Sequence, residues 1–106
     1  MLKKDLKKVQ ELLLAIPRGK VTTYGIMAKI MNMPQKARYI GRLLGSNPYP
    51  DKYPCYKVVK SDGSVGGYSG SKGVGEKIRL LAKDNVIIKK RRIIDFESKI
   101  FKFNMS

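Results

Sequence analysis

The chain has 106 residues, the size of one domain, and 42% of them are apolar, which is enough for one modest core. A formal net charge of +15 favours polyanionic partners, of which nucleic acid is the commonest and an anionic membrane surface the rival. One cysteine and no histidine exclude an internal disulfide and a Cys/His zinc site, and no apolar run is long enough to cross a bilayer.

The first half of the chain predicts three amphipathic helices. The first covers residues 5–16, the second covers 21–33 with Thr22 or Thr23 as its cap, and the third begins at Pro34 and stops at Gly45. Two short helices separated by a brief turn, the second with basic residues, suggest a helix-turn-helix. The apolar stripes are Leu6, Val9, Leu12, Leu13 and Ile16, then Met27, Ile30 and Met31, then Ala37, Ile40, Leu43 and Leu44.

Turns and glycines mark the middle of the chain. "CYKVV" (55–59) predicts a short strand, and "KSDGS" (60–64) predicts a turn. The glycine-rich stretch 65–75 predicts a loop whose backbone can come close to a ligand. Residues 73–85 predict a further helix, with one apolar face made of Val74, Ile78 and Leu81.

The C-terminal segment predicts a β-hairpin. Its strands are expected near Val86–Ile88 and Lys99–Phe103. The basic run from Lys89 to Arg92 is interpreted as a solvated turn, with a direct grip on phosphate as the alternative.

The one thiol lies in "NPYPDKYPCYKVVKSDGS", between a proline and a tyrosine. Most lone cysteines are small buried hydrophobes, so Cys55 is either core filler or a reactive residue. The chain has no histidine, and the usual general base of a Cys–His nucleophile is therefore absent. The residues by themselves leave both interpretations open.

Five short motifs, none specific alone, follow one another in a fixed order. They are IPRGKVTTYGIMA from Ile16, ARYIG from Ala37, NP at Asn47, PCYKV from Pro54 and GGYSG from Gly66. In this order and spacing, over residues 16–84, they resemble the DNA-binding domain of the O6-alkylguanine-DNA alkyltransferases.

That resemblance implies an α+β fold: a small winged-helix (helix-turn-helix) domain with a short C-terminal sheet or hairpin. It implies one domain over residues 1–106, without the N-terminal domain typical of full-length alkyltransferases. The implied activity is single-turnover DNA repair after minor-groove binding and base flipping. The thiolate of Cys55 takes the alkyl group, usually methyl, from O6 of guanine, and O4 of thymine is a further candidate.

The implied partner is double-stranded DNA that contains O6-alkylguanine, with other DNA repair proteins as further candidates. The protein is expected to be a monomer that needs no cofactor or metal and no membrane. Its expected location is the cytoplasm, with the nucleoid, or the nucleus in a eukaryote, as the place of action.

The resemblance also assigns roles to single residues. Arg38 fills the gap that the flipped base leaves, Tyr24 helps base rotation and protonation of the leaving group, and Asn47 holds the turn before the cysteine. The plainer alternatives are a solvated arginine, a packed aromatic ring and an ordinary flexible loop. The catalytic set is Cys55, Tyr56, Asp84, Tyr24 and Asn47; the DNA-binding set is Arg38, Tyr24, Thr23, Gln35, Lys36, Ala37, Tyr39 and Arg42; the lesion pocket is Tyr24, Val58, Gly66, Tyr68 and Ser69.

The sequence departs from the family at the activating residue. Tyr56 stands where the family has histidine, and Asp84 stands at the place of the glutamate that orients it. Tyrosine, with a reference pKa of about 10, is a poor base at neutral pH. Two replacements are conceivable: cationic surroundings, Lys57 included, could favour the thiolate, or a Tyr56–water–Asp84 relay could accept the proton. Tyr39 is larger than the small residue usual beside Arg38, so local groove contacts are expected to differ.

Two other functions stay open. The alkyltransferase-like proteins bind O6-alkylguanine without transfer and have tryptophan in place of the cysteine, and they too lack the N-terminal domain. A general winged-helix DNA-binding protein is the other alternative. The sequence favours transfer because the reacting sulfur is present.

Overall fold

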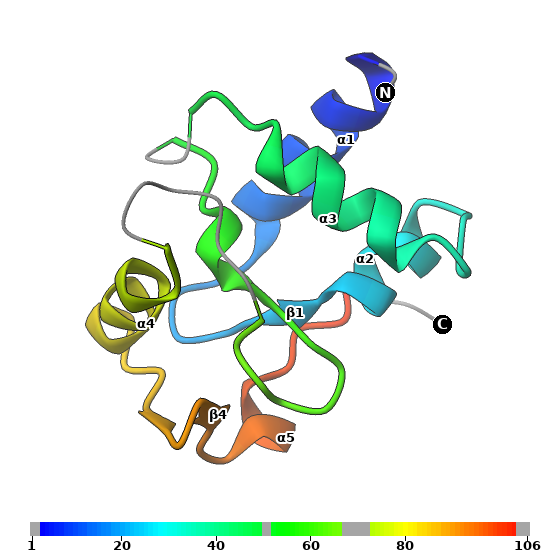
Figure 1. Ribbon diagram of the computed structural model, residues 1–106. Helices are drawn as coiled ribbons and strands as arrows, with labels where there is room; N and C mark the ends of the chain where they lie inside the picture. Colours follow the sequence, from blue (N-terminus) through cyan, green and yellow to red (C-terminus); the bar gives the residue numbers. More distant parts are fainter. Residues whose placement is uncertain (1–2, 50–51, 67–72, 104–106) are drawn as a thin grey trace.

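The computed structural model describes residues 3–49, 52–66 and 73–103 (Figure 1). The described residues form helices and four two-residue strands, and the predicted α+β class is confirmed. The described helices are α1 (Lys3–Ala15), α2 (Tyr24–Ile30), α3 (Ala37–Gly45), the 3₁₀ turn η1 (Cys55–Lys57), α4 (Gly73–Lys83) and α5 (Phe96–Lys99). The described strands are β1 (Thr22–Thr23), β2 (Val58–Val59), β3 (Ile88–Lys89) and β4 (Arg92–Ile93).

Helices α1, α2 and α3 pack around one core because each turns an apolar stripe inward. Nearly all of the predicted stripe residues are buried or half-buried there, and Cys55 and Val58 complete the same core. None of the helices in the described ranges has the length and apolar character that a membrane span requires. The fully buried members of this core are Val9, Leu13, Met27, Ala28, Ile40, Leu43 and Val58.

Helix α2 is shorter than the predicted 21–33. At its start the hydroxyl of Thr23 accepts a hydrogen bond from the Ile26 N–H at 3.0 Å, which confirms the predicted cap. At its end Asn32 is left-handed, with φ 60°, and the Met33 N–H bonds back to the Ala28 carbonyl. This reversal leads into a turn, so α3 begins three residues later than its predicted start at Pro34.

Strands β1 and β2 pair in parallel, Thr22 with Val58 and Thr23 with Val59. The strand predicted over 55–59 is therefore only two residues long, because its first three residues form η1. The pairing matters for the site, since Tyr24 directly follows β1 and η1 directly precedes β2. A second core, made of Val21, Val59, Val65, Leu81, Val86 and Ile93, lies under α4 and the hairpin.

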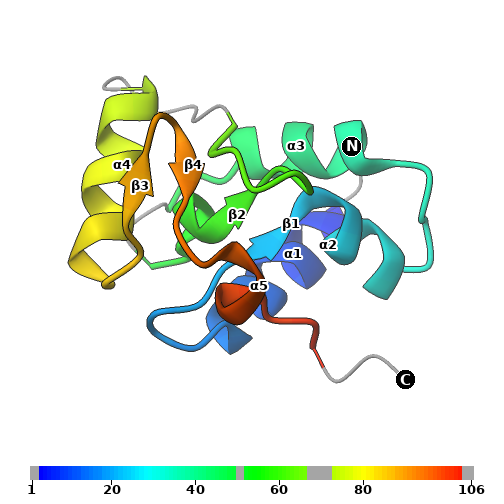
Figure 2. The same cartoon turned by 90° about the horizontal axis from the view of Figure 1, so that it is seen from below.

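The predicted C-terminal hairpin exists, but its second strand was wrong. Strand β3 turns back within two residues and pairs with β4, not with residues 99–103. Of those later residues, Lys99 ends α5, a helix that the sequence did not predict, and Ile100 forms a parallel bridge with Val21. Figure 2 shows the hairpin rising beside α4, with α5 at its base.

Candidate active site and nucleic-acid interface

Cys55 is the first residue of η1 and is only 7% exposed. Its N–H donates to the Tyr53 carbonyl at 2.8 Å, and the Asn47 side-chain amide donates to the same carbonyl at 3.1 Å. The Asn47 side-chain oxygen accepts from the Tyr49 N–H at 3.1 Å and from the Gln10 amide at 3.4 Å. Asn47 thus ties α1 and the loop together just before the thiol, which is the supporting position that the sequence predicts for it.

Tyr24 brings its phenol to the same site from the start of α2. The backbone of Gly66, where φ is 71°, lies close to the Tyr24 hydroxyl. A Cβ added to this residue would lie 3.4 Å from that hydroxyl, so the backbone of residue 66 lines the site. Burial raises the pKa of Tyr24 above its ordinary value, and the negative charge of the Cys55 thiolate raises it further. The phenol is therefore protonated at neutral pH and can donate. Two predicted pocket residues, Tyr68 and Ser69, lie outside the described residues.

The sequence did not predict the buried cation of this site, Lys77 of α4. It is 1% exposed, and its ammonium donates to the Val58 carbonyl at 2.6 Å and to the Tyr24 hydroxyl at 3.5 Å. The ammonium also lies 5.7 Å from the centre of the Tyr24 ring. Burial lowers the pKa of Lys77 to about 8, and the Cys55 thiolate acts in the opposite direction because it favours the charged ammonium.

The buried ammonium predicts a pH-dependent stability. The pKa of Lys77 is about 8 in the folded chain and 10.5 ordinarily, so between these values the unfolded chain binds more protons and stability rises with pH. We expect the unfolding free energy of wild type, relative to Lys77→Met, to rise by up to about 3 kcal/mol across this window. Urea unfolding in a Cys55→Ala background, which removes the titration of the thiol, measures it. A difference that stays constant with pH would contradict the lowered pKa.

Tyr56 and Asp84, paired by the sequence argument, meet in the structure. The Tyr56 hydroxyl donates directly to Asp84 Oδ2 at 2.9 Å. Because the hydroxyl donates there, its oxygen still has lone pairs that can accept a hydrogen bond from a water. The link between the two side chains needs no bridging water, so any water in a relay belongs on the thiol side of Tyr56.

The Lys57 ammonium is directed to two backbone carbonyls and to Asp84. Lys57 is 7% exposed, and its ammonium donates to the Ile16 carbonyl at 3.3 Å and to the Pro17 carbonyl at 3.5 Å. The same nitrogen lies 3.5 Å from Asp84 Oδ2. In a strand, residues 55 and 57 would share a face, but in a 3₁₀ turn with three residues per turn they point apart. Lys77 of α4, described above, interacts electrostatically with the thiol.

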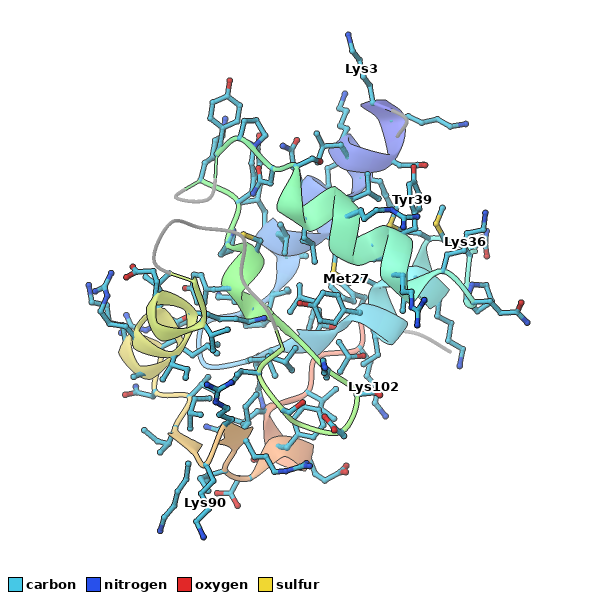
Figure 3. The ribbon with its side chains drawn as sticks, in the orientation of Figure 1. Lys3, Met27, Lys36, Tyr39, Lys90 and Lys102 are labelled. Carbon is cyan, nitrogen blue, oxygen red and sulfur yellow. The ribbon has the colours of Figure 1, made fainter. Side chains whose placement is uncertain are left out.

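Four of the eight predicted DNA-binding residues, Ala37, Arg38, Tyr39 and Arg42, lie on α3, and Gln35 and Lys36 directly precede it. The Tyr39 hydroxyl donates to Asp5 of α1 at 2.7 Å, and the Arg42 guanidinium lies 6.0 Å from the Tyr39 ring centre. Tyr39 therefore braces α3 against α1, and Figure 3 shows Tyr39 on this helix and Lys36 just before its start. A hollow of about 310 Å³ on this surface is lined by Gln35, Lys36, Arg38, Tyr39 and Arg42.

Three of the predicted DNA-binding residues, Tyr24, Thr23 and Ala37, do not line this hollow. Ala37 lines another hollow of about 310 Å³ together with Tyr24 and Lys60, so it connects the start of α3 with the phenol. Thr23 is 4% exposed and uses its hydroxyl to cap α2. The structure thus joins Ala37 to the site and gives Thr23 a mainly structural position.

The assembled site has the parts for a nucleophilic displacement. Cys55 supplies a soft nucleophile, Tyr24 a proton donor, and Lys77 a cation that favours the thiolate. The Tyr56 hydroxyl and the Asp84 carboxylate are a hydrogen-bonded pair that can pass on a proton. Within the described residues, no three side chains of the His, Cys, Asp or Glu type gather as a metal site would require.

The model of the family described as "6-O-methylguanine DNA methyltransferase, DNA binding domain" matches residues 6–86. The bifunctional methyltransferase/endonuclease of Thermoplasma volcanium is 45% identical over 82% of this chain and 27% of its own length. The methylated-DNA–protein-cysteine methyltransferase of Pyrobaculum aerophilum is 41% identical over 85% of this chain and 64% of its own length. The chain therefore spans less than two thirds of each of these relatives.

Solved structures show the same fold. S. pombe Atl1, crystallised with damaged DNA that contains O6-carboxymethylguanine, aligns with a TM-score of 0.85 over 96% of this chain and 98% of its own, at 24% identity. The O6-methylguanine-DNA methyltransferase of Pyrococcus kodakaraensis aligns with a TM-score of 0.69 over 81% of this chain and 48% of its own, at 40% identity. The lower identity of the first makes it evidence for the fold alone.

Proposed function

We propose the function from one premise: this chain belongs to the family of the 6-O-methylguanine DNA methyltransferase DNA-binding domain, whose model matches residues 6–86. The proposed activity is repair of O6-alkylguanine in double-stranded DNA by transfer of the alkyl group to Cys55. The observation that carries it is the placement of the thiol beside the phenol of Tyr24 and the buried ammonium of Lys77, within one small site.

In the proposed reaction the sulfur of Cys55 attacks the saturated alkyl carbon as the bond from that carbon to O6 breaks. The thiol proton leaves through the Tyr56 hydroxyl towards Asp84, to which that hydroxyl is hydrogen-bonded. The phenol of Tyr24, which stays protonated because its pKa is raised, gives a proton to the departing guanine. The alkylated cysteine has no means of release, so each molecule acts once.

The substrate base must leave the stacked duplex to reach a thiol that is 7% exposed. Arg38 is exposed on α3, at the rim of the hollow that this helix carries. A long planar cation can enter the stack and take the place of the extruded base. We therefore assign Arg38 to the gap in the duplex, and Lys36 and Arg42 to phosphate contacts.

A second function, lesion binding without transfer, is favoured by one observation. Tyr56, a poor base at neutral pH, stands where the family has histidine. Cys55 argues against it, because pure binding needs no thiol.

One experiment separates the two functions. Incubated with duplex DNA that carries O6-methylguanine, the protein is expected to gain the mass of one methyl group, which peptide mapping should place on Cys55. An unmodified mass together with preferential binding of the lesion duplex would establish the binder instead. Equal binding of lesion and plain duplex without modification would leave only general DNA binding.

A further inference from the structure

The β3–β4 hairpin ends in a turn whose residues are unusual for its geometry. Lys90 and Arg91 both have positive φ, 52° and 64°, the conformation that a two-residue hairpin turn fills most easily with Asn-Gly. Here two long cationic side chains occupy it, flanked by Lys89 and Arg92, and all four residues are exposed. Figure 3 shows Lys90 projecting away from the body of the protein. We call these four residues the hairpin tip.

The hairpin tip is held against the rest of the domain. The Val65 N–H donates to the Arg91 carbonyl at 3.0 Å, and the Ile93 N–H donates to the Gly63 carbonyl at 2.9 Å. These two bonds join the hairpin to the turn that follows β2. The cationic side chains therefore start from a fixed backbone position.

The charge of the hairpin tip is only partly compensated. The Arg92 guanidinium donates to the Asp62 carbonyl at 2.9 Å and lies 3.8 Å from the Asp62 carboxylate. Among the residues that the structure describes, no carboxylate comes within ion-pair distance of Lys89, Lys90 or Arg91. Three positive charges thus remain available to an outside anion.

The hairpin tip and α3 lie on one face of the molecule. Figure 2 shows both along the upper side, with the turn after β2 between them, while α5 and the C-terminal end of α4 lie on the lower side. Lys60 connects the two regions, because it lines the hollow shared with Tyr24 and Ala37 and also a hollow of about 350 Å³ shared with Gly66 and Arg91. The domain is 34 Å across in its two longer directions. A strand of B-DNA carries a phosphate every 3.4 Å or so, which places about ten along such a face.

We propose that the hairpin tip, with Lys60, is a second nucleic-acid contact, which grips the sugar-phosphate backbone at a distance from the bases that α3 addresses. The proposal rests on the proposed function, because it takes duplex DNA as the partner. The contact is with phosphate and is independent of sequence and of the lesion. Its effect is to lengthen the footprint and to hold the duplex while a base is extruded beside Tyr24.

The test uses a double variant that keeps the hairpin and removes the charge, Lys90→Asn with Arg91→Gly, since this pair suits the turn. Fluorescence anisotropy is measured with a plain duplex and an O6-methylguanine duplex over a series of salt concentrations. We expect weaker binding of both duplexes by roughly tenfold, and a log–log salt slope that is smaller by about 1.8 for two lost phosphate contacts. The melting temperature should stay the same or rise.

Two matched variants complete the test. Lys90→Arg with Arg91→Lys keeps the charge and should bind like wild type. Lys83→Ser with Lys99→Ser removes two charges at the ends of α4 and α5, on the opposite side, and should change the slope much less. Unchanged affinity and slope in the Asn-Gly variant, with methyl transfer intact, would overturn the second contact and leave the proposed function standing. If wild type binds no duplex, both the second contact and the proposed function fail. If the Asn-Gly variant loses binding only to phosphatidylserine vesicles, the hairpin tip is assigned to a membrane surface.

Discussion

Replacing Cys55 with alanine is expected to abolish alkyl transfer while leaving recognition of the lesion in place. The two other polar groups beside the thiol cannot substitute for it: the phenol of Tyr24 is protonated and the ammonium of Lys77 is largely so at neutral pH. We expect transfer to fall by at least about a thousandfold, as when a nucleophile is removed from other enzymes. Intact mass after incubation with the O6-methylguanine duplex measures transfer, and anisotropy with the same duplex measures binding.

Cys55→Ser is the control of similar shape. It keeps the volume of the side chain in a core that Cys55 helps to fill, but a hydroxyl is a much weaker nucleophile towards saturated carbon. Both variants should bind the lesion duplex in preference to the plain one. If either variant is methylated at another residue, Cys55 is not the acceptor of the methyl group. If both variants lose the preference for the lesion duplex, the sulfur takes part in recognition.

The helices were predictable because their apolar spacing is regular. Val9, Leu13, Ile40 and Leu43 recur at helical intervals and are all fully buried. The ends were less predictable, since Asn32 terminates α2 through a left-handed backbone without a glycine or proline to signal it. The hairpin register was missed for the same reason, because Lys90 and Arg91 form its turn with positive φ and neither is a glycine.

In the candidate site, the motifs predicted a contact that depends on the spacing of residues along the chain, but not one that depends on the local direction of the backbone. The pairing of Tyr56 with Asp84 followed from the resemblance, and the hydrogen bond is present. The direction of Lys57 did not follow, because η1 replaces the expected strand. Lys77 was overlooked because lysine is usually solvated, although it lies three residues after Val74, on the inward stripe of α4.

Removing the hydroxyl of Tyr56 is expected to slow transfer by about 10²-fold at neutral pH, the low end for loss of a general base. The hydroxyl oxygen can accept from a water while its own proton bonds Asp84, so Tyr56→Phe removes the relay and keeps the ring packed in the second core. A loss at the low end is expected because a thiol reacts usefully without a strong base. The rate of methyl transfer to the lesion duplex, measured across pH, gives the effect, and lesion binding should be unchanged.

Asp84→Asn should slow transfer by a similar factor, because it removes the carboxylate at the end of the relay. This variant also breaks the contact of Asp84 with Lys57, so Lys57→Met is its matched control. Loss of the ion pair alone should lower stability and leave the transfer rate of the folded protein nearly unchanged. Tyr56→His, which places an imidazole next to the thiol, should keep or raise the rate. Superimposable pH–rate profiles for wild type, Tyr56→Phe and Asp84→Asn would eliminate the relay, reduce Tyr56 to a packing residue and leave the buried ammonium of Lys77 as the group that favours the thiolate.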